Sequence, residues 1–287
     1  MNYRFLNKDD LPQLHRAYVE SFADYAIKIQ PTLEQISRVL TRNGLRWDIS
    51  AGAFDADARM VAFTANGFDK WLDQPTAYDS GTGVLPAHRR SGAAYRLFEF
   101  MLPKLREEGI RQYLLEVIST NEPALRLYSK LGFEQTRELE ILALDSPAHL
   151  AASDEQPAGL EIREIKEPDW ERLRTFWNCA PSWQNSARAI ARSKSAKLLL
   201  GAYLDGECVG YEVVSPSSGD IPQLAVSPQH RGRGIGSALL RAMCALIPPD
   251  KTVTMNNVDS TASEMLAFCA ARGFKPVITQ LEMLLKL

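Results

Sequence analysis

The stretch HRGRGIGSALL, residues 230–240, decides the fold of this chain. Small and charged residues fill its first half, and an apolar run that is typical of a helix follows. Glycines let the backbone before a helix turn so that the free N–H groups converge, and they leave room for a ligand. The helix dipole and the arginines add positive charge. We therefore predict a binding site for a phosphate or pyrophosphate group.

The predicted anion site includes the end of the preceding strand and the whole loop. Its candidate binding residues are Val226, Arg231, Gly232, Arg233, Gly234, Ile235 and Gly236. A P-loop is excluded because the glycines are not followed by Gly-Lys-Ser or Gly-Lys-Thr. A dinucleotide fingerprint is incomplete, since counting Gly-x-Gly-x-x-Gly from Gly232 places Ser237 at the last position. The loop therefore indicates another phosphate-bearing ligand.

A second copy of the pattern lies in the first half of the chain. VLPAHRRSGAAYRLFEFM at 84–101 resembles VSPQHRGRGIGSALLRAM at 226–243. Further pairs follow in the same order: 3–14 with 162–173, 127–134 with 268–275, and 139–144 with 281–286. Matching landmarks in order indicate an internal repeat, although two unrelated α/β domains with similar turns remain the alternative. The first loop adds the candidates Val84, Arg89, Arg90, Ser91, Gly92, Ala93 and Ala94.

The repeat predicts two tandem domains, 1–148 and 158–287. The segment between them, DSPAHLAASDEQPAG at 145–159, is rich in Ala, Ser, Asp and Pro and has no apolar period. Each half reads as a short strand, one or two helices, three strands, a helix, a strand, a helix and a last strand. We expect an α/β fold in which each domain is a mixed central sheet with helices on both faces.

Composition limits the function. The chain has 287 residues, 45% of them hydrophobic, and a net charge of −2, which argues against a general nucleic-acid binder. The four cysteines match no zinc spacing, so we predict no metal site and a reducing, cytoplasmic setting. The start of the chain lacks a signal core, and no run of about 18 apolar residues exists. We therefore expect no membrane partner, and a monomer or homodimer.

Together these motifs resemble a known superfamily. Arg-x-x-Gly-x-Gly or Ala, after a strand that ends in Val-x-Pro, resembles the coenzyme A pyrophosphate loop of the GNAT superfamily of N-acetyltransferases. It is Arg231-x-x-Gly234-x-Gly236 in one half and Arg89-x-x-Gly92-x-Ala94 in the other. The resemblance covers nearly the whole chain as a tandem pair. It implies acetyl-CoA as cosubstrate and a backbone N–H near Val84 that stabilises the developing oxyanion.

The segment YLLEVISTNEPALRLYSKLGF, 113–133, resembles the matching region of ribosomal-protein alanine N-acetyltransferases. This resemblance implies Glu116 as general base, Tyr128 as general acid and Asn121 as a cofactor-binding residue. A carboxylate can accept the proton of an attacking amine, and a phenol can protonate a departing thiolate. An outward-facing strand carboxylate and a packing aromatic are the alternative interpretations of Glu116 and Tyr128.

The second half lacks this pair. Aligned with the first half, it has Asn257 in place of Glu116, Ala262 in place of Asn121 and Cys269 in place of Tyr128. We therefore predict that the first domain is catalytic. The second domain would bind coenzyme A without turnover, complete the acceptor cleft or only stabilise the pair. Catalysis by the second domain, with Glu264 or Asp259, stays open.

The sequence thus predicts an acetyl-CoA-dependent N-acetyltransferase that transfers acetyl directly to a primary amine of a small molecule or peptide. Asp24, Asp69 and Asp79 are candidates to attract that amine, or are ordinary solvated acids. Two other functions remain. One is a mycothiol-synthase-like tandem enzyme that is active in the second domain. The other is a non-catalytic coenzyme A-binding regulatory protein.

Overall fold

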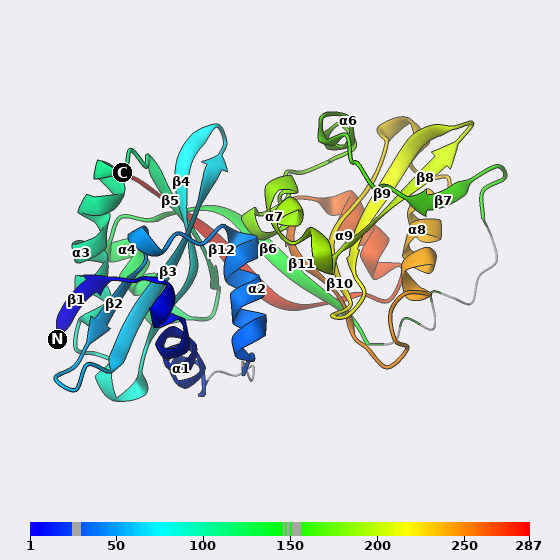
Figure 1. Cartoon of the computed structure of the whole chain (residues 1–287). Coiled ribbons are helices and arrows are strands. Elements are labelled where there is room, and N and C mark those ends of the chain that lie inside the picture. Colours follow the sequence, from blue (N-terminus) through cyan, green and yellow to red (C-terminus); the bar gives the residue numbers. More distant parts are fainter. Residues whose placement is uncertain (25–29, 146, 148–149, 151–155) are drawn as a thin grey trace. The chain divides into compact units, whose positions relative to one another are not determined.

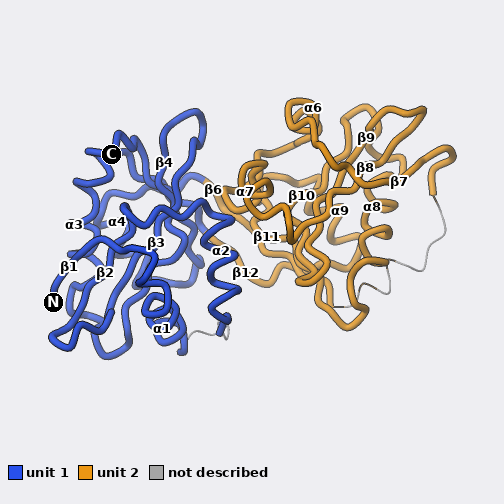
Figure 2. The backbone as a smooth tube through the Cα atoms, in the orientation of Figure 1, with its two compact units in different colours: residues 1–136, 281–287 blue, residues 137–280 orange. Residues whose placement is uncertain are grey.

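The computed structural model (Figure 1) describes residues 1–24, 30–145, 147, 150 and 156–287. The predicted α/β fold with two repeated units is confirmed. The first compact unit consists of residues 1–136 and 281–287, and the second of residues 137–280 (Figure 2). The domains predicted from the sequence, 1–148 and 158–287, differ from these units in the placement of one strand each.

The elements of the first unit follow the predicted order. Its strands are β1 (Asn2–Phe5), β2 (Ala51–Phe54), β3 (Met60–Trp71), β4 (Gln74–Val84) and β5 (Gln112–Ile118). Its helices are α1 (Leu11–Ser21), α2 (Leu33–Asn43), α3 (Ala93–Glu107) and α4 (Glu122–Lys130). Short 3₁₀ turns cover Lys8–Asp10, Trp47–Ile49 and Pro86–His88.

The second unit repeats this order with shorter helices at its start. Its strands are β7 (Glu161–Glu164), β8 (Leu198–Leu204), β9 (Glu207–Ser215), β10 (Asp220–Val226) and β11 (Val253–Asp259). Its helices are α6 (Trp170–Arg174), α7 (Ala187–Arg192), α8 (Ile235–Cys244) and α9 (Ser263–Ala270). Short 3₁₀ turns cover Trp183–Asn185, Lys194–Ala196 and Pro228–His230.

Two long strands cross the division between the units. These are β6 (Glu134–Leu144) and β12 (Lys275–Lys286). In the first unit the strand order is β1-β2-β3-β4-β5-β12, and in the second it is β7-β8-β9-β10-β11-β6. Each unit therefore takes its last strand from the end of the other repeat.

The exchanged strands complete the cores that receive them. Met283 and Leu285 of β12 are buried in the core of the first unit, which also contains Tyr113 and Phe133. Leu142 and Leu144 of β6 are buried in the core of the second unit. Since these side chains are apolar and alternate along their strands, each strand places one face on the core that it joins.

Local sequence signals explain where the helices end. Thr32 and Gln35 form a capping box at the start of α2, and Gly44 ends this helix in the left-handed conformation (φ 81°). Both phosphate-loop helices begin after a left-handed glycine, Gly92 for α3 (φ 78°) and Gly234 for α8 (φ 80°). The two predicted loops therefore have the same entry geometry.

Candidate active site

The sheet of the first unit opens between β4 and β5. Parallel pairing joins Thr76–Tyr78 to Gln112–Leu114, but β4 continues to Val84 and β5 to Ile118. The register of β3 against β4 shifts between Ala65 and Asn66, so Ser80 is an extra residue on β4. Such a bulge bends the strand that carries it. The bulge thus lies next to the point where the two strands separate.

Glu116 lies on β5 just beyond the last paired residues. Its side chain is half-buried, and the Tyr78 hydroxyl donates a hydrogen bond to Glu116 Oε2 over 3.0 Å. Tyr78 pairs with Leu114, and Glu116 is two residues further on, so the two side chains share one face of the sheet. Gly81, also on this face after the bulge, lies against Tyr18 of α1. The predicted base therefore lies on the α1 face.

Tyr128 approaches the opening from the other face. It lies on α4, is 7% exposed, and its ring packs at 6.0 Å from that of Phe98 and 5.5 Å from that of Phe133. The predicted base and acid thus come from different elements and meet the separated strands from opposite sides.

Asp79 is a buried carboxylate rather than an exposed one. Its Oδ1 accepts from the Gly81 N–H over 2.8 Å, and its Oδ2 accepts from the Thr82 hydroxyl over 2.7 Å. Burial raises the pKa of Asp79 to about 6, and the hydrogen bonds from Thr82 and Gly81, together with the Tyr128 phenol, oppose that rise. Both oxygens of the Asp79 carboxylate therefore accept hydrogen bonds from neighbouring groups of the protein.

The phosphate loop of the first unit is held by an arginine that faces the protein. Arg89 donates from Nε to the Val84 carbonyl over 3.3 Å and from Nη2 to the Ser21 carbonyl over 2.9 Å. It also forms an ion pair with Asp24, with contacts of 2.5 and 2.8 Å, which lowers the pKa of that carboxyl. This guanidinium therefore joins the loop to the end of α1.

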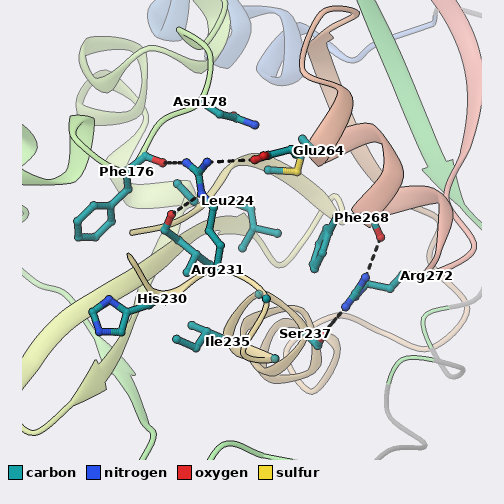
Figure 3. Close-up of a pocket in the computed structure, with 16 residues that line it drawn as sticks. Phe176, Asn178, Leu224, His230, Arg231, Ile235, Ser237, Glu264, Phe268 and Arg272 are labelled. Atoms are coloured by element: carbon teal, nitrogen blue, oxygen red, sulfur yellow. Dashed lines mark hydrogen bonds and ion pairs between the residues drawn. The ribbon is translucent and has the colours of Figure 1, made fainter. Parts of the chain in front are cut away.

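Arg231 repeats these contacts in the second unit. It donates from Nε to the Val226 carbonyl over 3.2 Å and from Nη2 to the Phe176 carbonyl over 2.9 Å. Its Nη1 pairs with Glu264 over 3.1 Å, as Figure 3 shows. The sequence predicts both arginines as candidate anion ligands, and in the structure their guanidinium groups bind main-chain carbonyls at the loops.

The phosphate loop of the second unit lines a cavity of about 430 Å³ (Figure 3). Its wall includes four residues from the loop and the start of α8, namely Gly232, Gly234, Ile235 and Gly236. Much of the predicted anion site therefore lines this cavity. A Cβ on Gly236 would lie 3.0 Å from the Phe268 ring, which accounts for glycine there.

Arg272 is a lining residue that the sequence analysis missed. It follows α9 and is half-buried, and its guanidinium stacks 3.7 Å over the Phe268 ring. Nη1 donates to the Phe268 carbonyl over 2.9 Å, and Nη2 donates to Ser237 Oγ at the start of α8. The sequence signal that could have identified it is the arginine in ARGF, residues 271–274, because the matching segment of the first repeat, residues 130–133, reads KLGF. This cation lies beside the amides that the loop presents.

Family models match both repeats. A model described as the acetyltransferase (GNAT) family covers residues 14–133, and one described as an acetyltransferase (GNAT) domain covers residues 195–276. The chain belongs to the GNAT acetyltransferase family. Within each match lies one of the two phosphate loops.

Solved structures show the tandem GNAT fold along the whole chain. A tandem GNAT protein from the clavulanic acid biosynthesis pathway aligns with a TM-score of 0.76 and 18% identity, over 99% of this chain and 98% of the other. A GCN5-related N-acetyltransferase from Sphaerobacter thermophilus aligns with a TM-score of 0.75 and 18% identity, over 99% and 95% of the two chains. At these identities the likeness concerns the fold.

Curated relatives match shorter stretches of this GNAT chain. Mycothiol acetyltransferase of Corynebacterium efficiens is 27% identical over 182 residues, which is 56% of this chain and 58% of that protein. Mycothiol acetyltransferase of Nocardia farcinica is 39% identical over 69 residues, 23% and 22% of the two chains. Streptothricin acetyltransferase of Streptomyces lavendulae is 32% identical over 81 residues, 28% and 42%. The alignments span between about a fifth and three fifths of these relatives.

The second GNAT unit presents different groups where the first has Glu116 and Tyr128. Asn257 is 6% exposed, has a φ of 60°, and donates to Ser182 Oγ over 3.3 Å. Burial raises the pKa of Cys269 to about 12, which keeps this thiol protonated. Asp259 accepts from the N–H and the hydroxyl of Thr261 over 2.9 and 2.6 Å. Its carboxylate thus supports the turn that precedes α9.

One further predicted residue has a definite place in the structure. Asn121 accepts from the Ala124 N–H over 3.3 Å, so its side chain caps α4. Within the described ranges we find no helix that is both long enough and apolar enough to cross a bilayer. Those same ranges contain no group of three or more His, Cys, Asp or Glu that could hold a metal ion.

Proposed function

We propose that this GNAT protein transfers acetyl from acetyl-CoA directly to a primary amine of a small molecule or peptide, and that the first unit performs the transfer. One arrangement supports the proposal. Tyr78 donates a hydrogen bond to Glu116, which lies just past the point where β4 and β5 stop pairing, and Tyr128 of α4 lies on the opposite face of the sheet. A carboxylate and a phenol at one opening in a sheet are suited to moving protons during acyl transfer.

The residues of the first unit take distinct parts in this reaction. Glu116 accepts the proton of the amine as its nitrogen attacks the thioester carbonyl. A backbone N–H near Val84 stabilises the oxyanion. Tyr128 donates its proton to the sulfur as the carbon–sulfur bond breaks. The N–H groups of Ser91–Ala94 hold the pyrophosphate, since Gly92 turns them toward one point at the start of α3.

The second unit is suited to hold coenzyme A without transferring acetyl. Its loop lines a cavity large enough for a substantial part of a nucleotide ligand, and Arg272 adds a positive charge. Asn257 and Cys269 give it neither a carboxylate nor a phenol at the positions of Glu116 and Tyr128. We propose that this unit is a second, non-catalytic coenzyme A site.

A second candidate is transfer by the second unit, and its cavity favours it. The mycothiol acetyltransferases among the relatives also support this alternative, which would make the first unit a scaffold. The two candidates predict opposite effects of substitutions in the two units.

The test combines an acceptor screen with variants of both units. Peptide N-termini, polyamines, aminoglycosides and amino acids are incubated with acetyl-CoA, and release of free thiol is measured. With an accepted amine, Glu116→Gln and Tyr128→Phe should each lower kcat by about 100-fold, while calorimetry still shows acetyl-CoA binding. Gly236→Val in the second unit should leave kcat within about threefold. The reverse pattern would assign catalysis to the second unit, and no transfer to any amine would refute the proposal.

A further inference from the structure

A smaller cavity of the second unit adjoins the one at its phosphate loop. The two cavities share four lining residues, Asn178, Leu224, Ala225 and Met265. Figure 3 shows Asn178 and Leu224 at the end of the larger cavity away from Ser237, which lies at the start of α8. An extended ligand that begins at the loop and follows the larger cavity therefore reaches the smaller one with its far end.

The smaller cavity has room for a short group only. Its volume is about 60 Å³, against about 430 Å³ for the larger cavity. This is the liquid volume of about two water molecules, which suits an acetyl group but not a long acyl chain. Its lining includes the apolar side chains of Ile221, Met255 and Met265, which are suited to contact a methyl group.

Buried hydrogen bonds form one wall of this smaller cavity. The Trp177 indole N–H donates to the Tyr211 hydroxyl, which donates to Gln223 Oε1 over 2.6 Å. Gln223 Nε2 donates to the Asn185 carbonyl over 2.5 Å, and Asn185 Nδ2 donates to the Asn256 carbonyl over 2.6 Å. All five residues line the cavity, and Tyr211, Gln223 and Asn185 are buried. Connected buried hydrogen bonds restrict movement, so this wall is rigid.

The first repeat has different residues at the positions that form the wall. Gln223 of β10 corresponds to Gly81 of β4, since each lies three residues before the valine that ends its strand. Tyr211 of β9 corresponds to Phe63 of β3, because their cross-strand partners, residues 225 and 83, directly precede the same valines. The first repeat thus has neither the amide nor the hydroxyl, so the GNAT fold does not require this wall.

We propose that the second unit selects a short-chain acyl-CoA over free coenzyme A, with the acyl group in the smaller cavity and Gln223 limiting its length. This inference rests on the proposed coenzyme A site of that unit. The acyl group enters past the residues that both cavities share and ends at the Gln223 amide. Because only binding is involved, the unit needs no acid or base at Asn257 or Cys269.

Calorimetry on the full chain with coenzyme A, acetyl-CoA and hexanoyl-CoA tests this selection. Each titration is repeated with Gly236→Val, whose side chain would meet the Phe268 ring, so the heat that this variant loses belongs to the second unit. In the parent, acetyl-CoA should bind there about fivefold more tightly than coenzyme A, because its methyl group is buried. Hexanoyl-CoA should bind at least about tenfold more weakly than acetyl-CoA, because its longer chain meets the wall.

A substitution at Gln223 should remove the length limit. Gln223→Ala deletes four non-hydrogen atoms, and hexanoyl has four carbon atoms more than acetyl, so hexanoyl-CoA should then bind within about threefold of acetyl-CoA. If this variant does not give folded protein, Tyr211→Phe combined with Gln223→Gly supplies the test, since the first repeat has these residues at the matching positions.

Lys197→Met is the matched control. The Lys197 side chain is 6% exposed in the same unit and donates to Ser215 Oγ over 3.0 Å, but neither residue is among those that line the two cavities. This variant also loses a buried polar contact, and it should keep the parent's order of affinities for the three ligands.

Each outcome decides the proposal. Equal affinities of the second unit for coenzyme A and acetyl-CoA, or hexanoyl-CoA bound as tightly as acetyl-CoA in the parent, would overturn the selection. Hexanoyl-CoA that stays excluded after the Gln223 substitutions would overturn the role of Gln223. If Gly236→Val loses no heat with any of the three ligands, the proposed coenzyme A site of the second unit is itself refuted.

Discussion

The Tyr78 hydroxyl lies 3.0 Å from Glu116 Oε2, although the strands that carry these residues stop pairing at Tyr78 and Leu114. A side-chain hydrogen bond thus continues the link between β4 and β5 where the backbone ladder has ended. It also fixes one oxygen of the proposed base, leaving the carboxylate oriented toward the opening.

Removal of this bond should weaken catalysis. We expect Tyr78→Phe to lower kcat by about tenfold, because a hydrogen bond to a charged group contributes about 1.5 kcal/mol. Steady-state kinetics with an accepted amine provide the measurement. Tyr3→Phe is the control, since within the part of the chain that the structure describes the Tyr3 hydroxyl has only the sulfur of Met1 as a hydrogen-bond partner. An unchanged kcat in Tyr78→Phe would show that Glu116 needs no such orientation.

The two phosphate loops differ in one strained residue. Arg90 has a φ of 60°, and Gly232 at the matching position has a φ of 73°. A left-handed conformation costs a residue other than glycine about 1 kcal/mol. We therefore expect Arg90→Gly to raise the free energy of unfolding by up to about 1 kcal/mol, and Gly232→Ala, which meets no atom within 4 Å, to lower it by a similar amount. Thermal melts of both variants check this, and equal signs would contradict it.

Arg272 should govern ligand binding to the second unit. A guanidinium that pairs with a phosphate contributes a charge-assisted hydrogen bond, so Arg272→Ala should weaken coenzyme A binding there by about tenfold. Calorimetry at two salt concentrations measures the change, and the affinity difference should shrink at high salt. Lys275→Ala, an exposed charge nearby in sequence, should have no such effect. Identical isotherms for Arg272→Ala and the parent would exclude a contact with the ligand.

Glu212 should make the protein less stable in alkali. It is completely buried on β9, and neither carboxylate oxygen has a hydrogen-bond partner within the described part of the chain. Burial raises its pKa from 4.5 to about 8. The folded form therefore binds this proton more tightly than the unfolded form.

The sign of the effect follows from this difference. The contribution of Glu212 to the free energy of unfolding should be most favourable below about pH 4.5. From there it should fall by up to about 1.4 kcal/mol per pH unit as the pH rises toward 8. Glu212→Gln carries no titrating group and should flatten this slope, whereas Glu161→Gln on exposed β7 should not. Urea titrations between pH 5 and 9 provide the comparison, and parallel slopes for the parent and Glu212→Gln would contradict the prediction.

The end of the chain should stabilise the first unit. Met283 is 4% exposed within the core of that unit, and Thr136 donates to Glu282 Oε1 over 2.7 Å. We expect Met283→Ala to lower the free energy of unfolding by about 3 kcal/mol, as for other large-to-small core substitutions. Hydrogen exchange should localise the loss of protection to β5, whereas Val277→Ala, 55% exposed, should leave it unchanged. Loss of protection confined to β11 would refute this assignment.

Much of the fold could be predicted from the sequence because turn and period signals are local. The glycines before α3 and α8 and the proline turns before both loops fix the same entry geometry in both repeats.

The exchange of β6 and β12 could not be predicted from such signals. Both strands have the alternating apolar pattern that either sheet requires, so pattern alone does not say which sheet each one joins. Partner choice depends on long-range packing around Met283 and Leu142, which periodicity does not encode.

The site was predictable in its residue types more than in its contacts. Glu116 and Tyr128 belong to the segment 113–133 that the sequence analysis singled out, but the bulge at Ser80 that places Asp79 and Thr82 on one face of the sheet has no distinctive local sequence. Arg89 and Arg231 resemble anion ligands by charge, while their guanidinium groups bind main-chain carbonyls. The charged residues predicted where the loops lie, whereas the contacts of each arginine side chain could be seen only in the structure.

The exchanged strands also set the timing of folding during synthesis. Residues 281–287 lie at the very end of this sequence, yet they form the last strand of the first unit. A ribosome that has released the first 136 residues has therefore not yet supplied all of that unit's sheet. The complete sheet of the amino-terminal unit therefore forms only after the carboxyl-terminal half has been synthesised.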